Sequence, residues 1–387
     1  MRTWKRAAAI VLALGMVLSA KATNALARES SAQPVEIAAR AAVLMDAATG
    51  EVLMAYNEHQ RLYPASVTKV MTLLLVAEAL AGGKLCLTDE ITVSTTASGK
   101  GGSQIWLREG ESMLVEDLLK AIAIYSANDA SVALAEAIAG SEEGFVALMN
   151  ERAAELGMVN TNFENSTGLD DTTENHLTTA YDIALMSREL LQHSEVVAYS
   201  TIWMDSLRDG ETELVNTNRL VRFFEGATGL KTGTTSRAGC CISATAMRED
   251  THLIAVVLGS DNSNDRFDTA KRMLNWGFAN YSTVTPEIEA NLITPVRVLH
   301  GEDRYITPVL PGGMPILVPR GSEDELQQNI ELALDVQAPV VEGQVLGRIT
   351  VVLDDEVVGE YTLTAPRAVQ ELRFVLMLQR LLGALVR

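Results

Sequence analysis

The stretch YPASVTKVMTLLLVAEAL, residues 63–80, is the most informative part of this chain. Its apolar residues from Val67 to Leu80 recur at helical spacing and end at Gly82-Gly83, so they predict a helix. Ser66 and Lys69 lie three positions apart, which places both side chains on one face of the first turn. A serine that caps a helix, followed by a surface lysine, is the ordinary alternative for this pattern taken alone.

The same spacing suits a serine nucleophile with a lysine as its base. A serine hydroxyl is a poor nucleophile until a base takes its proton. A neutral amine on Lys69 could be that base for Ser66, provided that burial or a neighbouring cation disfavours the ammonium form. Lys231 is the candidate for that neighbouring cation. The backbone N–H groups at the start of the helix could hold an oxyanion.

A second motif, Ser126-Ala127-Asn128, lies between two predicted helices, Val115–Ile124 and Ala130–Ala139. Loops on a rigid scaffold often carry functional side chains. Ser126 could move a proton between Lys69 and a leaving amine, and Asn128 could hold both a substrate amide and Lys69. The alternative is an ordinary turn with a capping residue.

A third motif, Lys231-Thr232-Gly233, precedes Thr234, Thr235 and a predicted strand at Cys240–Met247. Gly233 lets a substrate backbone approach the strand edge, where a peptide could pair as an added strand. Lys231, Thr232 and Thr235 could then hold a terminal carboxylate, while the Thr234 and Ser66 N–H groups form an oxyanion hole. A lysine-glycine turn is the alternative. The three motifs together, in this order, favour acyl transfer on a small peptide.

The remaining pattern predicts an α+β fold with two domains. Early strands at 40–45 and 51–56 form a hairpin, and a block of helices separates them from late strands. The sheet of domain 28–282 is therefore completed by both ends of the domain. The other elements expected there are helices at Glu143–Leu156, Thr179–Leu191 and Arg266–Tyr281 and a strand at His252–Gly259. Residues 283–365 show short alternating runs that predict a small all-β domain.

The first 27 residues predict a secretory signal peptide. Basic residues precede an apolar stretch at Ala7–Leu18, and Ala25-Leu26-Ala27 is a small-residue cleavage site. An uncleaved anchor is the alternative. The net charge of −19 becomes −23 after cleavage, because four basic residues and no acidic ones leave. We therefore expect an acidic, extracytoplasmic protein that does not bind nucleic acid.

The tail at 366–387 is the one basic, apolar segment that follows the predicted signal peptide. Arg373, Arg380 and Arg387 recur every seven residues, and the tail carries a net charge of +3. It predicts an amphipathic helix on the outer face of the cytoplasmic membrane; a helix docked on its own domain is the alternative.

The three cysteines, Cys86, Cys240 and Cys241, form neither a disulfide framework nor a metal-binding spacing. Cys240 and Cys241 lie in an apolar strand-like run, so we expect them to be buried thiols. A redox role is the alternative. We expect no metal and no cofactor.

The chain resembles the low-molecular-weight penicillin-binding proteins, specifically the serine-type D-Ala-D-Ala carboxypeptidases. Beyond the three motifs, the resemblance covers residues 63–80, 102–141, 165–186 and 226–241 and continues through the β-domain and tail. It implies a transpeptidase/β-lactamase-like domain, in which helices flank an antiparallel sheet, then a small all-β domain and a membrane helix.

The resemblance also implies an activity on peptidoglycan stem peptides. Ser66 would attack the penultimate D-alanine carbonyl, the terminal D-alanine would leave, and water would hydrolyse the acyl-enzyme. β-Lactams would acylate the same serine. The family uses an arginine near the late strand and helix to hold the substrate carboxylate, and Arg266 is our candidate, with Arg272 nearby and a salt bridge as the alternative.

Some features depart from the family pattern. Ala127 replaces a glycine of some members, and Thr234 replaces a histidine. A β-lactamase would need a deacylating Glu followed two residues later by Leu-Asn, and the stretch Glu174–Leu177 lacks that Asn. The motifs also allow a penicillin-binding sensor with little turnover, or an endopeptidase that cuts cross-links.

Overall fold

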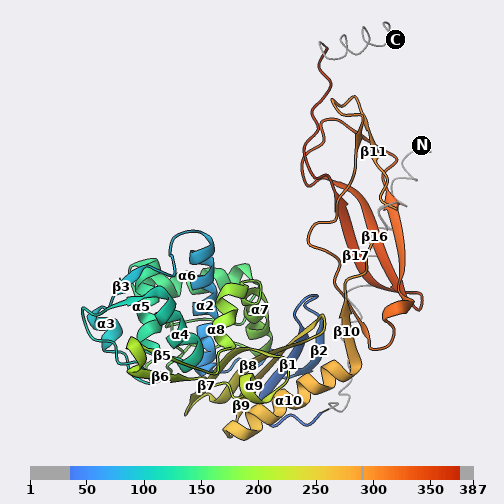
Figure 1. Cartoon of the computed structure of the whole chain (residues 1–387). Helices are drawn as coiled ribbons and strands as arrows, with labels where there is room; N and C mark the ends of the chain where they lie inside the picture. The colour runs from blue at the N-terminus through green and yellow to red at the C-terminus, as the bar shows by residue number, and fades with distance from the viewer. Residues whose placement is uncertain (1–34, 289–291, 375–387) are drawn as a thin grey trace, which may run out of the picture. The chain divides into compact units, whose positions relative to one another are not determined.

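The computed structural model describes residues 35–288 and 292–374 (Figure 1). The predicted signal peptide lies outside these residues. The helices and helical turns are η1 (Ala65–Thr68), α2 (Lys69–Ala81), α3 (Thr95–Ser98), α4 (Val115–Lys120), η2 (Ala121–Tyr125), α5 (Asn128–Ala139), α6 (Glu142–Glu155), α7 (Ala180–Leu190), α8 (Ser194–Ser200), η3 (Arg208–Gly210), α9 (Leu220–Phe223), α10 (Ser263–Asn280) and η4 (Glu323–Glu325).

Five strands of the first domain form an antiparallel sheet in the order β2-β1-β9-β8-β7. Its members are β1 (Ala41–Asp46), β2 (Val52–Tyr56), β7 (Ala227–Thr235), β8 (Gly239–Arg248) and β9 (Thr251–Ser260). Two short antiparallel pairs join β3 (Glu90–Thr92) with β4 (Ser112–Leu114) and β5 (Met204–Leu207) with β6 (Thr212–Val215). The prediction that both ends of the domain complete one sheet is confirmed.

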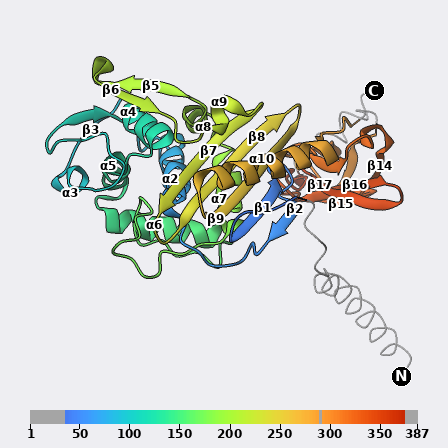
Figure 2. The ribbon, with the colours of Figure 1, turned by 90° about the horizontal axis from the view of Figure 1, so that it is seen from below.

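Helices cover both faces of this sheet. Helix α10 crosses one face, where it packs on β8 and β9, while α7 packs on the other and contacts α2 (Figure 2). Strand β7 is an edge strand, so one side of its backbone is available for pairing. The third motif precedes β8, which confirms the strand predicted at Cys240–Met247, and the motif itself lies within β7, a strand that was not predicted.

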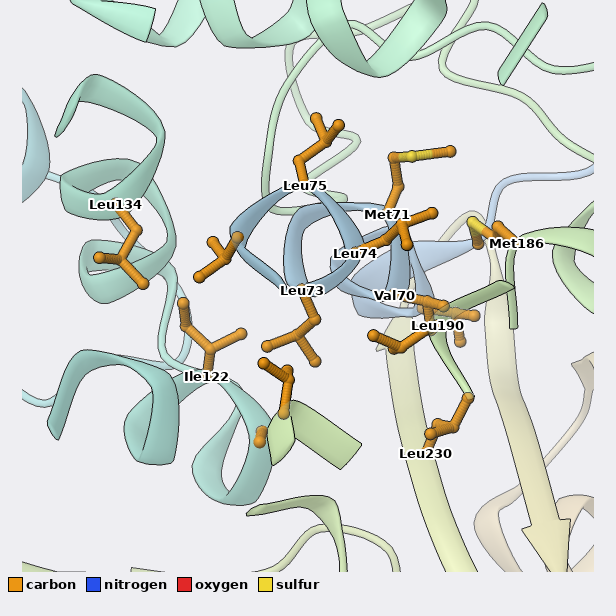
Figure 3. Packing of buried hydrophobic residues seen from close by; sticks show 14 of the residues in the cluster. Val70, Met71, Leu73, Leu74, Leu75, Ile122, Leu134, Met186, Leu190 and Leu230 are labelled. Atoms are coloured by element: carbon orange, nitrogen blue, oxygen red, sulfur yellow. The ribbon is translucent and has the colours of Figure 1, made fainter. Parts of the chain in front are cut away.

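Helix α2 is the centre of the main core. Side chains project from it in several directions, and they meet apolar residues of η2, α5, α7 and β7 (Figure 3). A helix that is apolar all round must be buried on all sides. The residues that Figure 3 labels are Val70, Met71, Leu73, Leu74, Leu75, Ile122, Leu134, Met186, Leu190 and Leu230. This packing fixes the position of the turn that precedes α2.

The predicted all-β domain is also confirmed. Its strands are β10 (Tyr281–Val284), β11 (Val296–Leu299), β12 (Tyr305–Ile306), β13 (Ile316–Pro319), β14 (Gln327–Leu332), β15 (Asp335–Gln337), β16 (Val345–Leu353) and β17 (Glu356–Thr364). The order β14-β16-β17 gives one three-stranded sheet, and β12-β11-β15 gives another. Two small apolar clusters lie between these elements.

The predicted start of the tail helix at residue 366 is wrong. Residues 366–373 are not helical, and bridges pair Val369 with Val340 and Glu371 with Gly301. Burial of Val369 in the β-domain explains the difference, since an extended chain carries this side chain into an apolar cluster. The part of the predicted helix at 375–387 lies outside the described residues. No helix among those described is long and apolar enough to cross a membrane.

Candidate active site

The first motif forms a tight turn at the start of α2. Residues Ala65–Thr68 make the 3-10 turn η1, and Lys69 is the first residue of the α-helix. Lys69 is fully buried, whereas Ser66 is partly exposed. Lys69 Nζ lies 3.2 Å from Ser66 Oγ. The predicted proximity of the two side chains is thus what the structure shows.

Lys69 Nζ has two further partners, and both are hydrogen-bond acceptors. They are Asn128 Oδ1 at 2.6 Å and the Thr167 carbonyl at 2.8 Å. A neutral amine has two hydrogens to donate and one lone pair, so these acceptors leave the lone pair for the Ser66 hydroxyl. Burial, and secondly the charge of Lys231, lower the pKa of Lys69 well below its usual 10.5. The site therefore favours the amine over the ammonium form.

The second motif brings a hydroxyl and an amide to the same place. Ser126 follows the π-helical turn η2 and has a left-handed backbone with φ 71°. Its hydroxyl is buried and has no hydrogen-bond partner among the described residues. Asn128 begins α5, with its N–H on the Ser103 carbonyl (2.7 Å) and its side-chain Nδ2 on the Gly101 carbonyl (2.7 Å). The side-chain amide is thereby oriented with its oxygen toward Lys69.

The third motif passes directly over the nucleophile. A Cβ atom built on Gly233 would lie 2.6 Å from Ser66 N, so only glycine fits this approach. Lys231 is buried, and its Nζ donates to the Thr232 carbonyl at 3.0 Å. Burial, and secondly the charge of Arg266, lower the pKa of Lys231 to about 7.

The threonines of β7 have different surroundings. Thr232 Oγ1 donates to Thr217 Oγ1 at 2.7 Å, and Thr234 is exposed. Thr235 Oγ1 donates to the carboxylate of Asp170 and accepts from Ala238 N–H. The proton of the Thr235 hydroxyl is therefore committed to Asp170, and this residue is the least available of the predicted carboxylate ligands.

Arg266 lies behind β7 and is buried. Its Nη1 lies 3.0 Å from the Gly233 carbonyl, 3.1 Å from Thr234 Oγ1 and 3.2 Å from the Cys241 carbonyl. The structure thus brings Arg266 to the third motif, and its role in binding the substrate carboxylate stays a prediction. Cys240 and Cys241 are buried, which confirms that prediction, and burial raises the pKa of Cys241 to about 11.

The loop that carries Thr167 contributes to the site and was not predicted from the sequence. In this loop Gly168 has φ +84°, and a Cβ atom there would lie 1.8 Å from the Ala65 carbonyl oxygen. Asn165 Oδ1 accepts from the N–H groups of Thr167 (3.1 Å) and Gly168 (2.7 Å). These contacts hold the Thr167 carbonyl against Lys69. The Asn-Ser-Thr-Gly run is typical of a turn, and this is the sequence feature from which the loop could have been predicted.

A buried histidine next to the nucleophile turn was not predicted either. His176 Nδ1 accepts from Glu164 N–H at 3.0 Å, so the neutral ring carries its hydrogen on Nε2, 2.8 Å from Thr68 Oγ1. Burial, and secondly the charge of Lys69, lower the pKa of His176 to about 4. His176 is therefore neutral at physiological pH and positions Thr68.

Comparisons with known proteins agree with this geometry. Residues 27–262 match the family described as D-alanyl-D-alanine carboxypeptidase, and residues 281–371 match the C-terminal domain of penicillin-binding protein 5. The chain is 39% identical to the D-alanyl-D-alanine carboxypeptidase DacF of Bacillus subtilis, over 96% of this chain and 97% of that protein.

Solved structures show the same likeness. Penicillin-binding protein 5 from Haemophilus influenzae is 33% identical with a TM-score of 0.77, over 88% of this chain and 100% of that one. Penicillin-binding protein D2 from Listeria monocytogenes, solved in its ampicillin-bound form, is 30% identical with a TM-score of 0.58. That match covers 63% of this chain and 98% of the other.

Proposed function

This chain belongs to the D-alanyl-D-alanine carboxypeptidase family, and we propose that Ser66 is its nucleophile and Lys69 the base. The protein is a serine-type D-Ala-D-Ala carboxypeptidase that acts on peptidoglycan stem peptides and is acylated by β-lactams. The observation that carries the proposed roles is the set of three contacts at Lys69 Nζ.

Acylation begins when the lone pair of Lys69 takes the Ser66 hydroxyl proton. Ser66 Oγ then attacks the carbonyl of the penultimate D-alanine, and the oxyanion forms near the N–H groups of Ser66 and Thr234. Gly233 makes this oxyanion site possible, because the absence of a side chain lets β7 lie close to Ser66 N. The peptide pairs along the free edge of β7, which orients the scissile bond.

The terminal D-alanine leaves as an amine and needs a proton. Ser126 relays this proton from Lys69, and its lack of a hydrogen-bond partner in the described residues leaves its hydroxyl free to do so. Lys231 and Thr232 bind the terminal carboxylate, and Asn128 holds the amide of the acyl residue. Arg266 adds positive charge behind Gly233 and Thr234. Water then hydrolyses the ester, with Lys69 again as the base.

The test of this function is release of D-alanine from diacetyl-Lys-D-Ala-D-Ala. We expect release by the wild type and none by Ser66→Ala. Stable penicillin labelling of the wild type without D-alanine release would favour a sensor instead, and rapid nitrocefin turnover would favour a β-lactamase.

We further propose that the protein works at the outer face of the cytoplasmic membrane. Residues 1–27 have the sequence features of a removable signal peptide, and 366–387 combine four arginines with apolar residues. Liposome flotation of the mature protein tests the tail: the full chain should float with anionic vesicles, and a chain truncated before residue 375 should not. Equal binding by both would contradict the anchor.

A further inference from the structure

An exposed tryptophan lies close to the active site, and the reaction described above does not use it. The side chain of Trp106 is 75% exposed, the highest value among the tryptophan, tyrosine and phenylalanine residues that the structure describes. Its backbone has φ +59°, a left-handed conformation that is strained for a bulky residue. An indole in solvent regains little of this strain energy by packing in the fold. Its position therefore indicates contact with a ligand.

The residues on either side of Trp106 are held by buried contacts. The N–H groups of Ile105 and Leu107 donate to Asp129 Oδ2 at 3.1 and 3.0 Å, and Asp129 is fully buried. The side chains of Ile105 and Leu107 are buried as well, and the Ile105 carbonyl accepts from Arg208 Nη1 at 2.9 Å. The backbone that carries the indole is thus fixed on both sides, so a ligand would meet it with little loss of conformational entropy.

The loop that carries Trp106 lies along the second motif. The Ser103 carbonyl accepts from Asn128 N–H at 2.7 Å, and the Gly101 carbonyl accepts from Asn128 Nδ2 at 2.7 Å. Asn128 Oδ1 in turn lies 2.6 Å from Lys69 Nζ. Trp106 follows Ser103 by three positions, and three residues span at most about 11 Å. The indole therefore lies at the rim of the active site, on the side of Asn128.

The direction of β7 brings the far end of a stem peptide toward this loop. A peptide that pairs with β7 runs toward Thr235, whose hydroxyl donates to Asp170. Leu169, the residue before Asp170, lies beside Gly102, with its Cδ2 at 3.3 Å from a Cβ atom built there. The start of the Trp106 loop is therefore next to the place where the stem leaves β7.

The length of the stem suits a contact between its glycan end and Trp106. In a pentapeptide stem the reacting carbonyl belongs to the fourth residue, and the glycan is attached to the first. Four extended residues span at most about 14 Å. The sugar of a stem that reacts at Ser66 is thus within the same distance range as the indole.

The surroundings of the indole suit a sugar ring. One face of a hexose presents C–H groups that pack flat on an aromatic ring, while its hydroxyl and acetamido groups need polar neighbours. Gln104, which is half-buried, supplies a side-chain amide beside Trp106. A membrane surface would need a wider apolar face, and Trp106 is the one exposed apolar side chain of residues 101–110.

We propose that Trp106 stacks on an N-acetylated sugar of the glycan strand that carries the stem peptide. The inference rests on the proposed carboxypeptidase function and deepens it, because it makes the sugar-bearing stem a better substrate than the free peptide. The indole lies away from the reacting carbonyl and contacts the substrate and the transition state alike. The contact therefore lowers KM rather than raising kcat.

The test compares two substrates that differ only in the sugar. One is the disaccharide pentapeptide GlcNAc-MurNAc-pentapeptide, and the other is the same pentapeptide without the disaccharide. We expect the wild type to show about fivefold higher kcat/KM for the first, as suits one aromatic contact. Trp106→Gly should bring this ratio to about one by raising KM for the sugar-bearing stem. Trp106→Phe keeps a flat ring and should keep part of the preference.

Two controls separate a sugar contact from a structural role. Tyr305→Ala removes an exposed aromatic ring of β12 and should keep the wild-type ratio. Trp106→Gly should unfold at about the same urea concentration as the wild type, because glycine relieves the left-handed strain while its greater flexibility offsets that gain. A large loss of stability in Trp106→Gly would instead assign the ring to the fold.

The outcomes that contradict the proposal are distinct. Equal use of the two substrates by the wild type, or a ratio unchanged in Trp106→Gly, would overturn the sugar contact while D-alanine release persists. Loss of vesicle binding in Trp106→Gly with an unchanged ratio would assign the ring to a membrane surface. Absence of D-alanine release from both substrates would overturn the proposed function and this inference with it.

Discussion

Lys69 Nζ donates a 2.6 Å hydrogen bond to Asn128 Oδ1, and both residues are buried. This contact joins the first and second motifs, which are 59 positions apart in the chain. Its importance is that Asn128 and the Thr167 carbonyl occupy two positions around the nitrogen and leave the third to Ser66. The geometry thus prepares Lys69 to accept a proton.

Replacement of Lys69 by arginine should abolish acylation, because a guanidinium stays protonated at every accessible pH. We expect Lys69→Arg to lower the benzylpenicillin acylation rate by about a thousandfold or more. In the wild type the rate should fall as pH falls through the lowered pKa of Lys69, where the amine gains a proton. The exposed Lys84→Arg serves as control and should behave as wild type. Appreciable acylation by Lys69→Arg would exclude Lys69 as the base.

The alkaline side of the pH profile should report Lys231. This residue must be protonated to bind a carboxylate, and its pKa in the free enzyme lies at about 7. The kcat/KM for peptide should therefore fall as pH rises above about 7, since kcat/KM reports the free enzyme. In Lys231→Arg the fall should move to much higher pH, because a guanidinium keeps its charge there. An identical alkaline limb in both proteins would show that another group controls it.

Gly168→Ala should destabilise the protein far more than an ordinary left-handed glycine does. The added Cβ would meet the Ala65 carbonyl at 1.8 Å, so the loop or the nucleophile turn must move. Gly157→Ala is the matched control, because Gly157 has φ +75° and nothing within 4 Å of its Cβ position. Urea unfolding should show a loss of about 1–2 kcal/mol for Gly157→Ala and several kcal/mol for Gly168→Ala. Equal losses of stability in the two variants would mean that the 164–173 loop and the nucleophile turn can move apart at little cost, which would contradict a rigid contact between them.

His176 should make the protein sensitive to acid. Its pKa is about 4 in the folded state and 6.5 in the unfolded chain, so the unfolded chain binds more protons between these values. Stability is therefore lost as pH falls from about 6.5 to about 4, by roughly 3 kcal/mol. His176→Gln should show a smaller change in the free energy of unfolding over this window. The same pH dependence in both proteins would contradict a buried neutral His176.

The sequence was sufficient for the parts of the site that depend on side-chain type and local spacing. Ser66 and Lys69 meet because they lie three positions apart in a helical turn. Lys231 and Gly233 were identified by a motif whose chemistry needs a cation and a bare Cα. Arg266 came from resemblance alone, and its contacts with Gly233 and Thr234 depend on how α10 packs against β8.

What the sequence did not predict depends on backbone atoms and tertiary packing. Thr167 acts through its backbone carbonyl. Every residue has such a carbonyl, so the residue type at position 167 does not predict this contact with Lys69. His176 is placed by long-range folding beside Thr68. The predicted amphipathic helix began at residue 366, yet tertiary pairing of Val369 with Val340 keeps this part of the chain from forming a helix. Buried tertiary contacts therefore outweigh the local sequence pattern in deciding the backbone conformation of this segment.

The position of the covalent adduct decides whether Ser66 is the nucleophile. The wild type and Ser66→Ala would be incubated with benzylpenicillin, and the attachment site would be mapped by mass spectrometry of proteolytic peptides. We predict one adduct in the wild type, on Ser66, and none in Ser66→Ala. An adduct on another residue of the wild type, or labelling of Ser66→Ala equal to that of the wild type, would contradict the assignment.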